Sequence, residues 1–241
     1  MVQLLVSAAL AVPVDVDALK RTLGEVAPIR AQRGASKVPQ IPDASRWMAA
    51  QTGKVETGLV EIPGHAARLG WGVGAVDVNA AKLMAALSDD QSKPNYTSLE
   101  RVVLVDGRWC APKRRVLQFL PMGLVTDRWW VVDQAVQTQL AQASAGRMLE
   151  TTWHSVEDPV LSGEAATVAA GGISIAFTQG AWLLIPLGPE TTWVEYHAWS
   201  DPGGSVPAAL ASRFAASGIP DAIAGMVALA KAGPRCAVAP G

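Results

Sequence analysis

Three histidines and two glutamates are the side chains whose chemistry matters first. His65, His154 and His197 share no spacing typical of metal ligands, so they predict no metal centre. His197 follows Glu195 closely in a tryptophan-rich segment and could act as an acid or base if that segment lines a cavity. Glu150 and Glu195 could form a carboxylate pair, although the sequence does not set their distance. A hydrogen-bonded or solvent-facing His197 is the simpler interpretation.

Three further segments resemble chemical motifs, and each has a simpler explanation. Residues 70–74, Gly-Trp-Gly-Val-Gly, misplace the third glycine of a dinucleotide loop and lie in no βαβ unit. Residues 172–176, Gly-Ile-Ser-Ile-Ala, lack the last glycine of a nucleophile elbow, and no helix follows. Residues 113–115, Lys-Arg-Arg, fit the solvated start of a strand better than a phosphate-contacting patch. We therefore expect no cofactor.

Tryptophan dominates the aromatic residues, with nine copies against two tyrosines and three phenylalanines. Most of the tryptophans fall within or at the ends of predicted strands: Trp109, Trp129, Trp130, Trp153, Trp182, Trp193 and Trp199. Core packing is the simple explanation, because aromatic residues favour strands. A cavity for a large flat apolar molecule also needs stiff aromatic walls. We expect both roles, for different tryptophans.

Composition excludes several classes of protein. The chain has 241 residues, of which 50% are hydrophobic and 17% charged, so it is not intrinsically disordered. A net charge of -1 gives no positive field that would attract nucleic acid. Two cysteines are too few for a disulfide scaffold or a cysteine-based zinc site. No apolar stretch approaches the length of a membrane span. We expect a soluble monomer with no nucleic-acid partner.

The two ends of the chain are predicted to be appendages. Residues 1–11 are apolar and end in Ala-x-Ala, but they lack the basic start of a secretory signal and are short. We expect a cytoplasmic protein with an N-terminal segment at 1–41 and a flexible tail at 234–241. Cys110 and Cys236 would pair only after export, so free thiols are expected.

Pattern and turn residues predict the order of the elements. Helices are expected at 42–53, after the N-cap Asn79 through residue 87, and from 205 onward with a kink or a split at residues 218–220. Residues 28–42 are predicted to be an irregular connection. Strands are expected at 54–62, 68–78, 101–105, 115–120, 128–138, 147–157, 172–177, 181–187 and 191–200.

These elements predict an α+β fold. Short turns between consecutive strands require antiparallel pairing, because parallel crossovers need a dozen or more residues. We expect a curved antiparallel sheet with helices on one face, wrapped around a long C-terminal helix. A strongly bent sheet around one helix leaves more volume than the facing side chains fill, so an internal cavity is expected.

Several spaced segments point to a known family. They are Gly180-Ala181-Trp182, Pro186, residues 192–196 (Thr-Trp-Val-Glu-Tyr), residues 201–204 (Asp-Pro-Gly-Gly), Pro207 and, upstream, residues 120–128 (Leu-Pro-Met-Gly-Leu-Val-Thr-Asp-Arg). In this order they resemble the START lipid-transfer domains of the helix-grip (Bet v 1-like) superfamily. The resemblance covers roughly residues 47–233, within a domain that we place at 42–233.

The resemblance implies a hydrophobic tunnel between the sheet and the terminal helix that holds one lipid, often a sterol or phospholipid. It also implies a lid loop at 121–127. Met122, Leu124 and Val125 are apolar residues in that loop, so it could touch a bilayer transiently. Burying three such side chains would contribute about 5 kcal/mol, which is too little for permanent anchoring.

Alternation along the last strands predicts which residues line the tunnel. The Val194/Tyr196 face carries no charge and is expected to point inward. Arg128 in a tunnel needs a carboxylate or a ligand oxygen, and Asp127, Glu150 or Glu195 could supply it. The predicted ligand-binding residues are Trp182, Leu184, Val194, Tyr196, Arg128, Trp130, Phe214 and Leu210.

Three functions fit these observations. The favoured one is a carrier that binds a lipid or other apolar molecule, performs no catalysis and meets membranes transiently. The second is an enzyme on the same fold, such as a polyketide aromatase/cyclase or a small hydrolase, using His197, Glu195 or Glu150. The third is a sensor that binds a protein partner through exposed tryptophans when its ligand is present.

Overall fold

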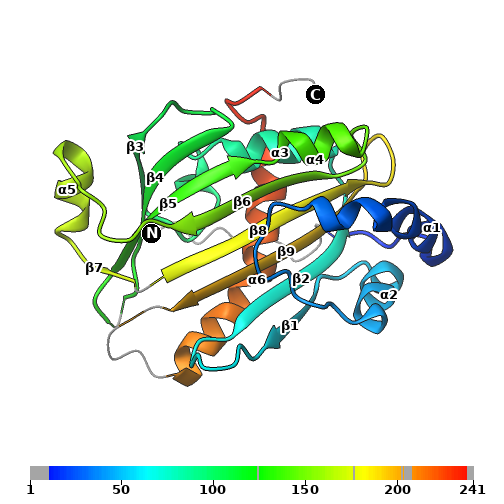
Figure 1. Ribbon diagram of the computed structural model, residues 1–241, viewed down its shortest axis with the longest axis horizontal. Coiled ribbons are helices and arrows are strands. Elements are labelled where there is room, and N and C mark those ends of the chain that lie inside the picture. Colours follow the sequence, from blue (N-terminus) through cyan, green and yellow to red (C-terminus); the bar gives the residue numbers. More distant parts are fainter. Residues whose placement is uncertain (1–10, 124, 176, 202, 204–207, 238–241) are drawn as a thin grey trace.

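The computed structural model describes residues 11–123, 125–175, 177–201, 203 and 208–237. Its elements are α1 (Val16–Val26), η1 (Ala27–Gln32), α2 (Asp43–Thr52), β1 (Glu56–Val60), β2 (Leu69–Val76), α3 (Ala80–Ser88), η2 (Lys93–Asn95), β3 (Arg101–Asp106), β4 (Lys113–Leu120), β5 (Arg128–Val136), α4 (Thr138–Ala143), β6 (Leu149–Ser155), α5 (Gly163–Ala169), β7 (Ile173–Ser174), β8 (Phe177–Pro186), β9 (Thr192–Asp201) and α6 (Ala208–Ala232). Helices lie on both sides of one large sheet (Figure 1).

The sheet has the strand order β1-β2-β9-β8-β6-β5-β4-β3, and all neighbours along this path are antiparallel. Only the two-residue strand β7, among the described strands, pairs in parallel, with β5. The predicted α+β class and antiparallel sheet are therefore confirmed. Pairing of β2 with β9, for example Gly72 opposite Tyr196, joins the early strands to the late ones.

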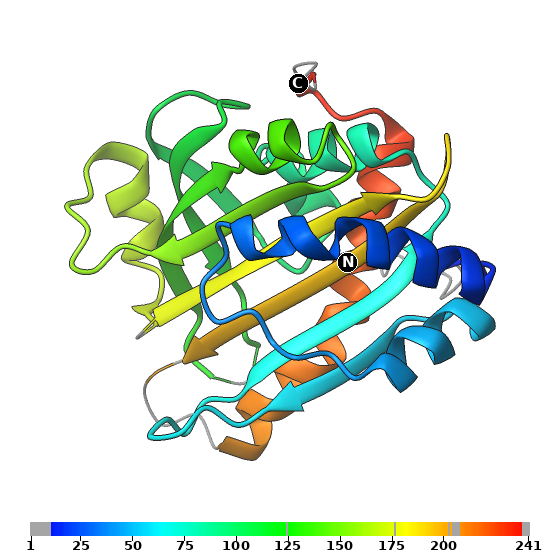
Figure 2. The same cartoon turned by 45° about the vertical axis from the view of Figure 1, so that its right-hand side comes forward.

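α6 crosses the inner face of the sheet (Figure 2). Small residues allow the close approach. A Cβ atom added to Gly72 of β2 would lie 2.3 Å from Cγ2 of Ile219. One added to Gly225 of α6 would lie 2.0 Å from the carbonyl oxygen of Tyr96. Both glycines therefore place α6 against its neighbours. α6 runs through Pro220 as one helix, so the sequence there does not split it in two.

The outer face carries a layer of which the sequence analysis predicted only the helix at 42–53. α1 and η1 cross it, and α2 packs beside them (Figure 2). Asp15 caps α1 by accepting a hydrogen bond from the backbone N–H of Ala18, and Leu19 and Val26 are buried against the sheet. The predicted irregular connection at 28–42 therefore begins with the helical turn η1. Helices cover both faces, not one.

A disulfide joins Cys110 to Cys236, with 5.3 Å between their Cα atoms. The expectation of free thiols was therefore wrong. The bond ties the segment after α6 to the loop between β3 and β4. Nearby, the backbone N–H of Arg235 donates to Oδ2 of Asp89 at 2.8 Å. The possible signal at residues 1–11 lies almost wholly outside the described residues, as does the end of the predicted tail.

Among the described residues, no helix combines the length and the hydropathy needed to cross a membrane.

Candidate functional site

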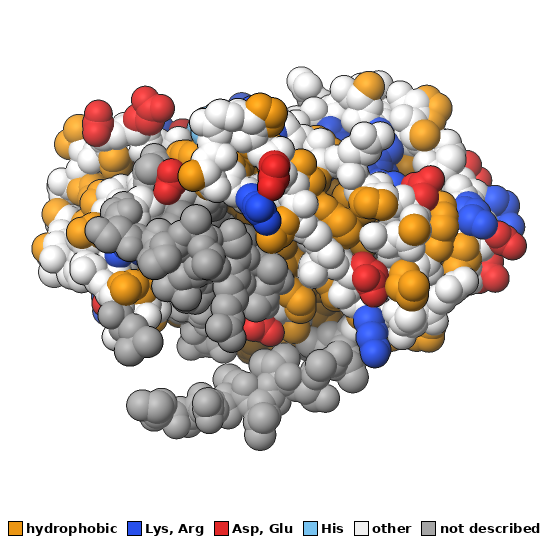
Figure 3. All heavy atoms as spheres, turned by 90° about the horizontal axis from the view of Figure 1, so that it is seen from below, with side chains coloured by type: hydrophobic (Ala, Val, Ile, Leu, Met, Phe, Trp, Pro, Cys, Tyr) orange, Lys and Arg blue, Asp and Glu red, His pale blue; other side chains and the backbone are white. Residues whose placement is uncertain are grey.

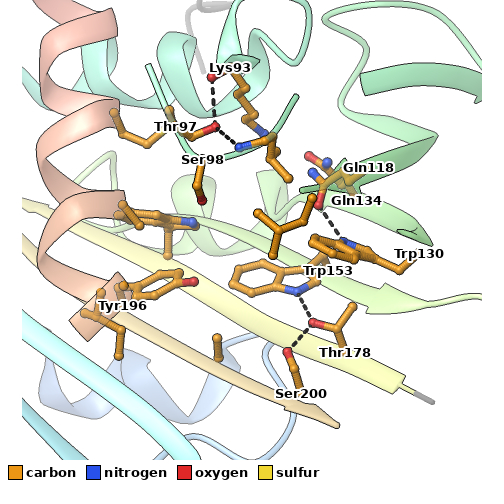
Figure 4. Close-up of a pocket in the computed structure, with 18 of the residues that line it drawn as sticks. Lys93, Thr97, Ser98, Gln118, Trp130, Gln134, Trp153, Thr178, Tyr196 and Ser200 are labelled. Atoms are coloured by element: carbon orange, nitrogen blue, oxygen red, sulfur yellow. Dashed lines mark hydrogen bonds between the residues drawn. The ribbon is translucent and has the colours of Figure 1, made fainter. Parts of the chain in front are cut away.

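A cavity of about 380 Å³ lies between the inner face of the sheet and α6. Its walls come from β4, β5, β6, β8, β9, α6 and the segment that begins with η2 (Figure 4). Ala198 on β9 and Gly218 and Ala222 on α6 face this space. Because these side chains are small, the sheet and the helix meet without filling the volume between them.

Stiff aromatic rings form one side of the cavity. The ring of Tyr196 stacks on Trp153 with centroids 5.8 Å apart and planes 21° apart, and it lies 4.2 Å from the ring of Trp182. Nε1 of Trp153 donates to Oγ1 of Thr178 at 3.3 Å, and that hydroxyl lies 2.7 Å from Oγ of Ser200. These contacts hold the rings in place before any ligand arrives.

Two half-buried polar groups face the cavity without a hydrogen-bond partner among the described residues. Gln118 accepts a hydrogen bond from Nε1 of Trp130 at 2.7 Å, which fixes its amide. Within the described residues, no hydrogen bond is made by Nε2 of Gln118 or by the hydroxyl of Tyr196, although both residues line the cavity. Burial raises the pKa of Tyr196, so it stays neutral. These groups are available to a polar atom of a ligand.

A buried ionic cluster adjoins the cavity near η2. Asp90 accepts hydrogen bonds from Nζ of Lys93, from Nε of Arg114 and, at 3.1 Å, from Nε2 of Gln134. Burial alone would raise the pKa of Asp90, but the charges of Lys93 and Arg114 outweigh it and lower that pKa. Burial lowers the pKa of Lys93, and the attraction of Asp90 opposes this only in part. Lys93 and Gln134 line the cavity.

Comparison with known proteins was informative only at the level of structure. No protein-family model matches the chain, and no curated protein matches it. Among solved structures, it is similar to a STAR-related lipid transfer protein from Xanthomonas axonopodis, with a TM-score of 0.60 and 15% identity over 83% of this chain and 99% of that one. It is also similar to the human StAR-related lipid transfer protein 5, with a TM-score of 0.57 and 15% identity over 90% and 97% of the two chains. A third is human STARD10, with a TM-score of 0.54 and 15% identity over 83% and 82%.

The fold is the START-like helix grip. This likeness confirms the fold that the sequence motifs predicted, and identities of this size establish nothing finer. The helix grip in this chain encloses the cavity described above, on the side of the sheet that α6 covers.

Some of the predicted ligand-binding residues line the cavity, and others do not. Trp182, Tyr196, Trp130 and Arg128 line it. Leu184 and Val194 are fully buried in the adjacent core with α3 and α6 and are not part of the lining. Leu210 and Phe214 belong to α6, but their side chains lie outside the described part of the structure.

The predicted lid loop begins at the cavity. Met122 lines the cavity, and its backbone N–H donates to Oδ1 of Asp127 at 2.8 Å. Val125 is 37% exposed, and Leu124 lies outside the described residues. Arg128 is buried, and its guanidinium donates to the carbonyl of Thr126, so a backbone oxygen takes part of the role expected of a carboxylate.

Sequence reasoning missed several residues of the lining: Lys93, Gln118, Gln134, Trp153 and Thr178. A polar signal existed for the two glutamines, which interrupt apolar strands. Trp153 could have been placed by alternation along β6. Lys93 lies within residues 89–94, which the sequence predicts only as a loop and which gave no sign of a binding role.

The acid–base candidates lie on the opposite face of the sheet from the cavity. Glu195 and His197 alternate with Tyr196 and Ala198 along β9, so they point outward. Glu150 does the same on β6. All three are buried beneath η1 and the segment that follows it, where Nε of Arg33 donates to Oε1 of Glu150 at 2.6 Å. The idea that they act in the cavity, or pair there with Arg128, was wrong.

Three arginines surround the outer-face glutamates. Arg30 donates to Oε2 of Glu195, and Nε of Arg46 lies 3.5 Å from Oε1 of the same carboxylate. Burial would raise the pKa of Glu195, but the charges of Arg30, Arg46 and Arg33 outweigh it and lower that pKa. Burial also lowers the pKa of His197, to about 4. The ion pairs on this face therefore act as an electrostatic clamp: they hold the N-terminal layer of α1, η1 and α2 against the sheet.

Proposed function

We propose that the protein binds one hydrophobic ligand, a lipid or sterol-like molecule, in the cavity and carries it between membranes without changing it. The observation that supports this most is the unfilled cavity with aromatic walls. A domain that needed only stability would fill this volume, because each void costs packing energy. The rings of Trp153, Trp182 and Tyr196 instead surround an open space.

The size and lining of the cavity narrow the ligand class. A volume of about 380 Å³ lies near the lower end of ligand pockets, which span roughly 300–1,000 Å³. This favours a compact ring system or a single chain over a phospholipid with two chains. The amide of Gln118 and the hydroxyl of Tyr196 favour a ligand with at least one polar atom.

Transient membrane contact is the expected route for ligand entry. Val125 and Ile173 are exposed hydrophobic residues, at 37% and 41%. The backbone N–H of Ile173 donates to the carbonyl of Asp127 at 3.0 Å, which brings β7 beside the lid loop. On the face shown in Figure 3, positive and negative side chains lie among hydrophobic ones. Weak insertion of a small apolar tip suits a monomeric carrier that must leave the membrane again.

No observation favours the two other functions. An aromatase/cyclase or hydrolase would need acid–base groups in the cavity, and Glu150, Glu195 and His197 face the other way. A sensor of the kind described would need exposed tryptophans, and every tryptophan is buried or half-buried. We therefore infer a binding protein and not an enzyme.

The test is to detect the ligand and then to fill the cavity. Native mass spectrometry of the purified protein is expected to show one bound apolar molecule, which organic extraction releases. Ala198→Trp places an indole in the cavity and should weaken binding of a fluorescent fatty-acid probe by roughly tenfold or more. Ala143→Trp, on the exposed surface of α4, is the matched control and should bind normally. Unchanged binding by Ala198→Trp, in a folded protein, would contradict the proposal.

A further inference from the structure

Lys93 is a primary amine that lines an otherwise mainly uncharged cavity. Its side chain is 11% exposed and runs from η2 toward the side of the cavity where Gln118 and Gln134 lie (Figure 4). The other lysines are all exposed: Lys20, Lys37, Lys54, Lys82, Lys113 and Lys231. A carrier of purely inert lipids has no need for an amine at this position.

The groups around Lys93 stay hydrogen-bonded to one another whether or not Lys93 is protonated. Nε of Arg114 donates to Asp90, and Nη2 of Arg114 donates to Gln134 at 2.7 Å. Nε2 of Gln134 in turn donates to Asp90 at 3.1 Å. Asp90 therefore keeps a cation and an amide as partners if Lys93 loses its proton. Arg114 is fixed further by the carbonyls of Ala111 and Leu87, at 3.0 and 3.4 Å.

The charges around Lys93 balance both before the reaction and in a protonated covalent adduct. Asp90 and Arg114 face its amine, and buried Asp89 lies close enough to attract it. Asp89 is itself held by the backbone N–H groups of Ser92 and Arg235. With Lys93 protonated the four charges sum to zero. A protonated imine at Lys93 would carry the same charge and donate its N–H to Asp90 in the same way.

We propose that Lys93 is a covalent binding site for apolar aldehydes, forming an imine with a ligand held in the cavity. This inference rests on the proposed function, because the cavity must first accept the apolar part of the ligand. It extends that function from passive binding to reversible covalent capture. The aromatic walls suit the chain or ring that carries the carbonyl group.

The chemistry needs no oxidant, reductant or metal. The lone pair of the neutral amine attacks the carbonyl carbon, and the π electrons of the carbonyl move to its oxygen. The resulting carbinolamine loses that oxygen as one water molecule, which takes one proton from the amine and the proton that Lys93 released on becoming neutral, while the C=N bond forms and the nitrogen keeps its last proton. One protonated amine and one aldehyde give one protonated imine and one water. Burial lowers the pKa of Lys93 and so increases its neutral fraction.

The test is to trap the imine and find which lysine carries it. The whole protein is incubated with decanal and sodium cyanoborohydride near neutral pH, and peptides are mapped by mass spectrometry. Each unit by which a lysine pKa falls gives roughly tenfold more neutral amine at neutral pH, so Lys93 should carry most of the label. At alkaline pH the label on the exposed lysines should rise far more than that on Lys93.

Three controls decide the outcome. Decanol, which has no carbonyl, should protect Lys93 from decanal by occupying the cavity. Propanal, which is small and hydrophilic, should label the exposed lysines. Lys93→Arg keeps the charge and the partner Asp90 and should remove the main label without lowering the unfolding midpoint. If decanol displaces a fluorescent fatty acid but decanal leaves Lys93 unlabelled, the inference fails and the carrier function stands. If neither decanol nor decanal displaces the probe, both fail.

Discussion

Neighbouring residues on β9 meet opposite environments. Glu195 points outward, is 2% exposed and is surrounded by Arg30, Arg33 and Arg46. Tyr196 points inward and presents a hydroxyl to an unfilled cavity. The outer face is packed, its two buried glutamates are paired with arginines, and these ion pairs fix the N-terminal layer. The inner face leaves a cavity unfilled and presents polar atoms to it that a ligand can bind. Alternate residues of β9 therefore serve different purposes: those that point outward stabilise the fold, and those that point inward are available for binding.

The largest expected effect is on the outer face. Glu195→Ala removes the carboxylate that Arg30, Arg33 and Arg46 share, and leaves them with only Glu150 and the exposed Asp43 as acidic partners among the described residues. Removing one partner of a buried ion pair costs about 3–5 kcal/mol of unfolding free energy. Urea denaturation should show this loss, whereas the folded fraction should bind a fluorescent fatty acid as the wild type does. Glu195→Gln, which keeps the shape, is the control and should lose less. A loss below about 1 kcal/mol would show that the clamp contributes little.

A second, smaller effect concerns pH and His197. Its pKa is about 4 in the folded protein, against an ordinary 6.5, because the ring is buried and faces Arg33, with Glu195 and the backbone of Ser36 opposing the shift. Below pH 6.5 the unfolded chain therefore takes up a proton that the folded protein refuses until about pH 4. Stability falls across this window by about 3 kcal/mol.

Urea titrations at several pH values measure this dependence. His197→Gln, which removes the titrating group, should flatten the slope between neutrality and pH 5. Glu195 adds its own loss only below its ordinary pKa of 4.5, so the two groups can be separated. An unchanged slope in His197→Gln would assign the acid sensitivity to other groups.

The contrast between the faces also explains what the sequence could predict. Alternation and turn residues set the strands, and absence of charge chose the inward face of β9. The sequence could not predict which of the inward-facing residues reach the cavity and which are buried in the core. Val194 and Leu184 lie where α3 and α6 fill the space, whereas Tyr196 and Trp182 lie farther along, where they do not. The packing of helices from distant parts of the chain decides this.

The N-terminal layer shows a different kind of miss. Val16, Leu19, Leu23 and Val26 recur at helical spacing, so α1 carried a local signal that was overlooked. By contrast, no local pattern says that Arg33 will reach Glu150, which lies 117 residues away. Charged residues on strands were assigned to a cavity because a covering layer was not foreseen. Once the N-terminal layer is placed, their burial follows from the arginines that η1, the residue after it and α2 contribute.

The smallest expected effect comes from substituting Tyr196, the residue next to Glu195. Tyr196→Phe removes a hydroxyl that has no protein partner among the described residues, so no buried group is left unsatisfied. The ring contacts with Trp153 and Trp182 persist. Unfolding free energy should change by less than about 0.5 kcal/mol in urea. Binding of an apolar probe without polar atoms should tighten slightly, because the cavity loses a group that must be dehydrated. A large loss of stability would mean that this hydroxyl holds the fold together, and that the inner face serves packing as the outer one does.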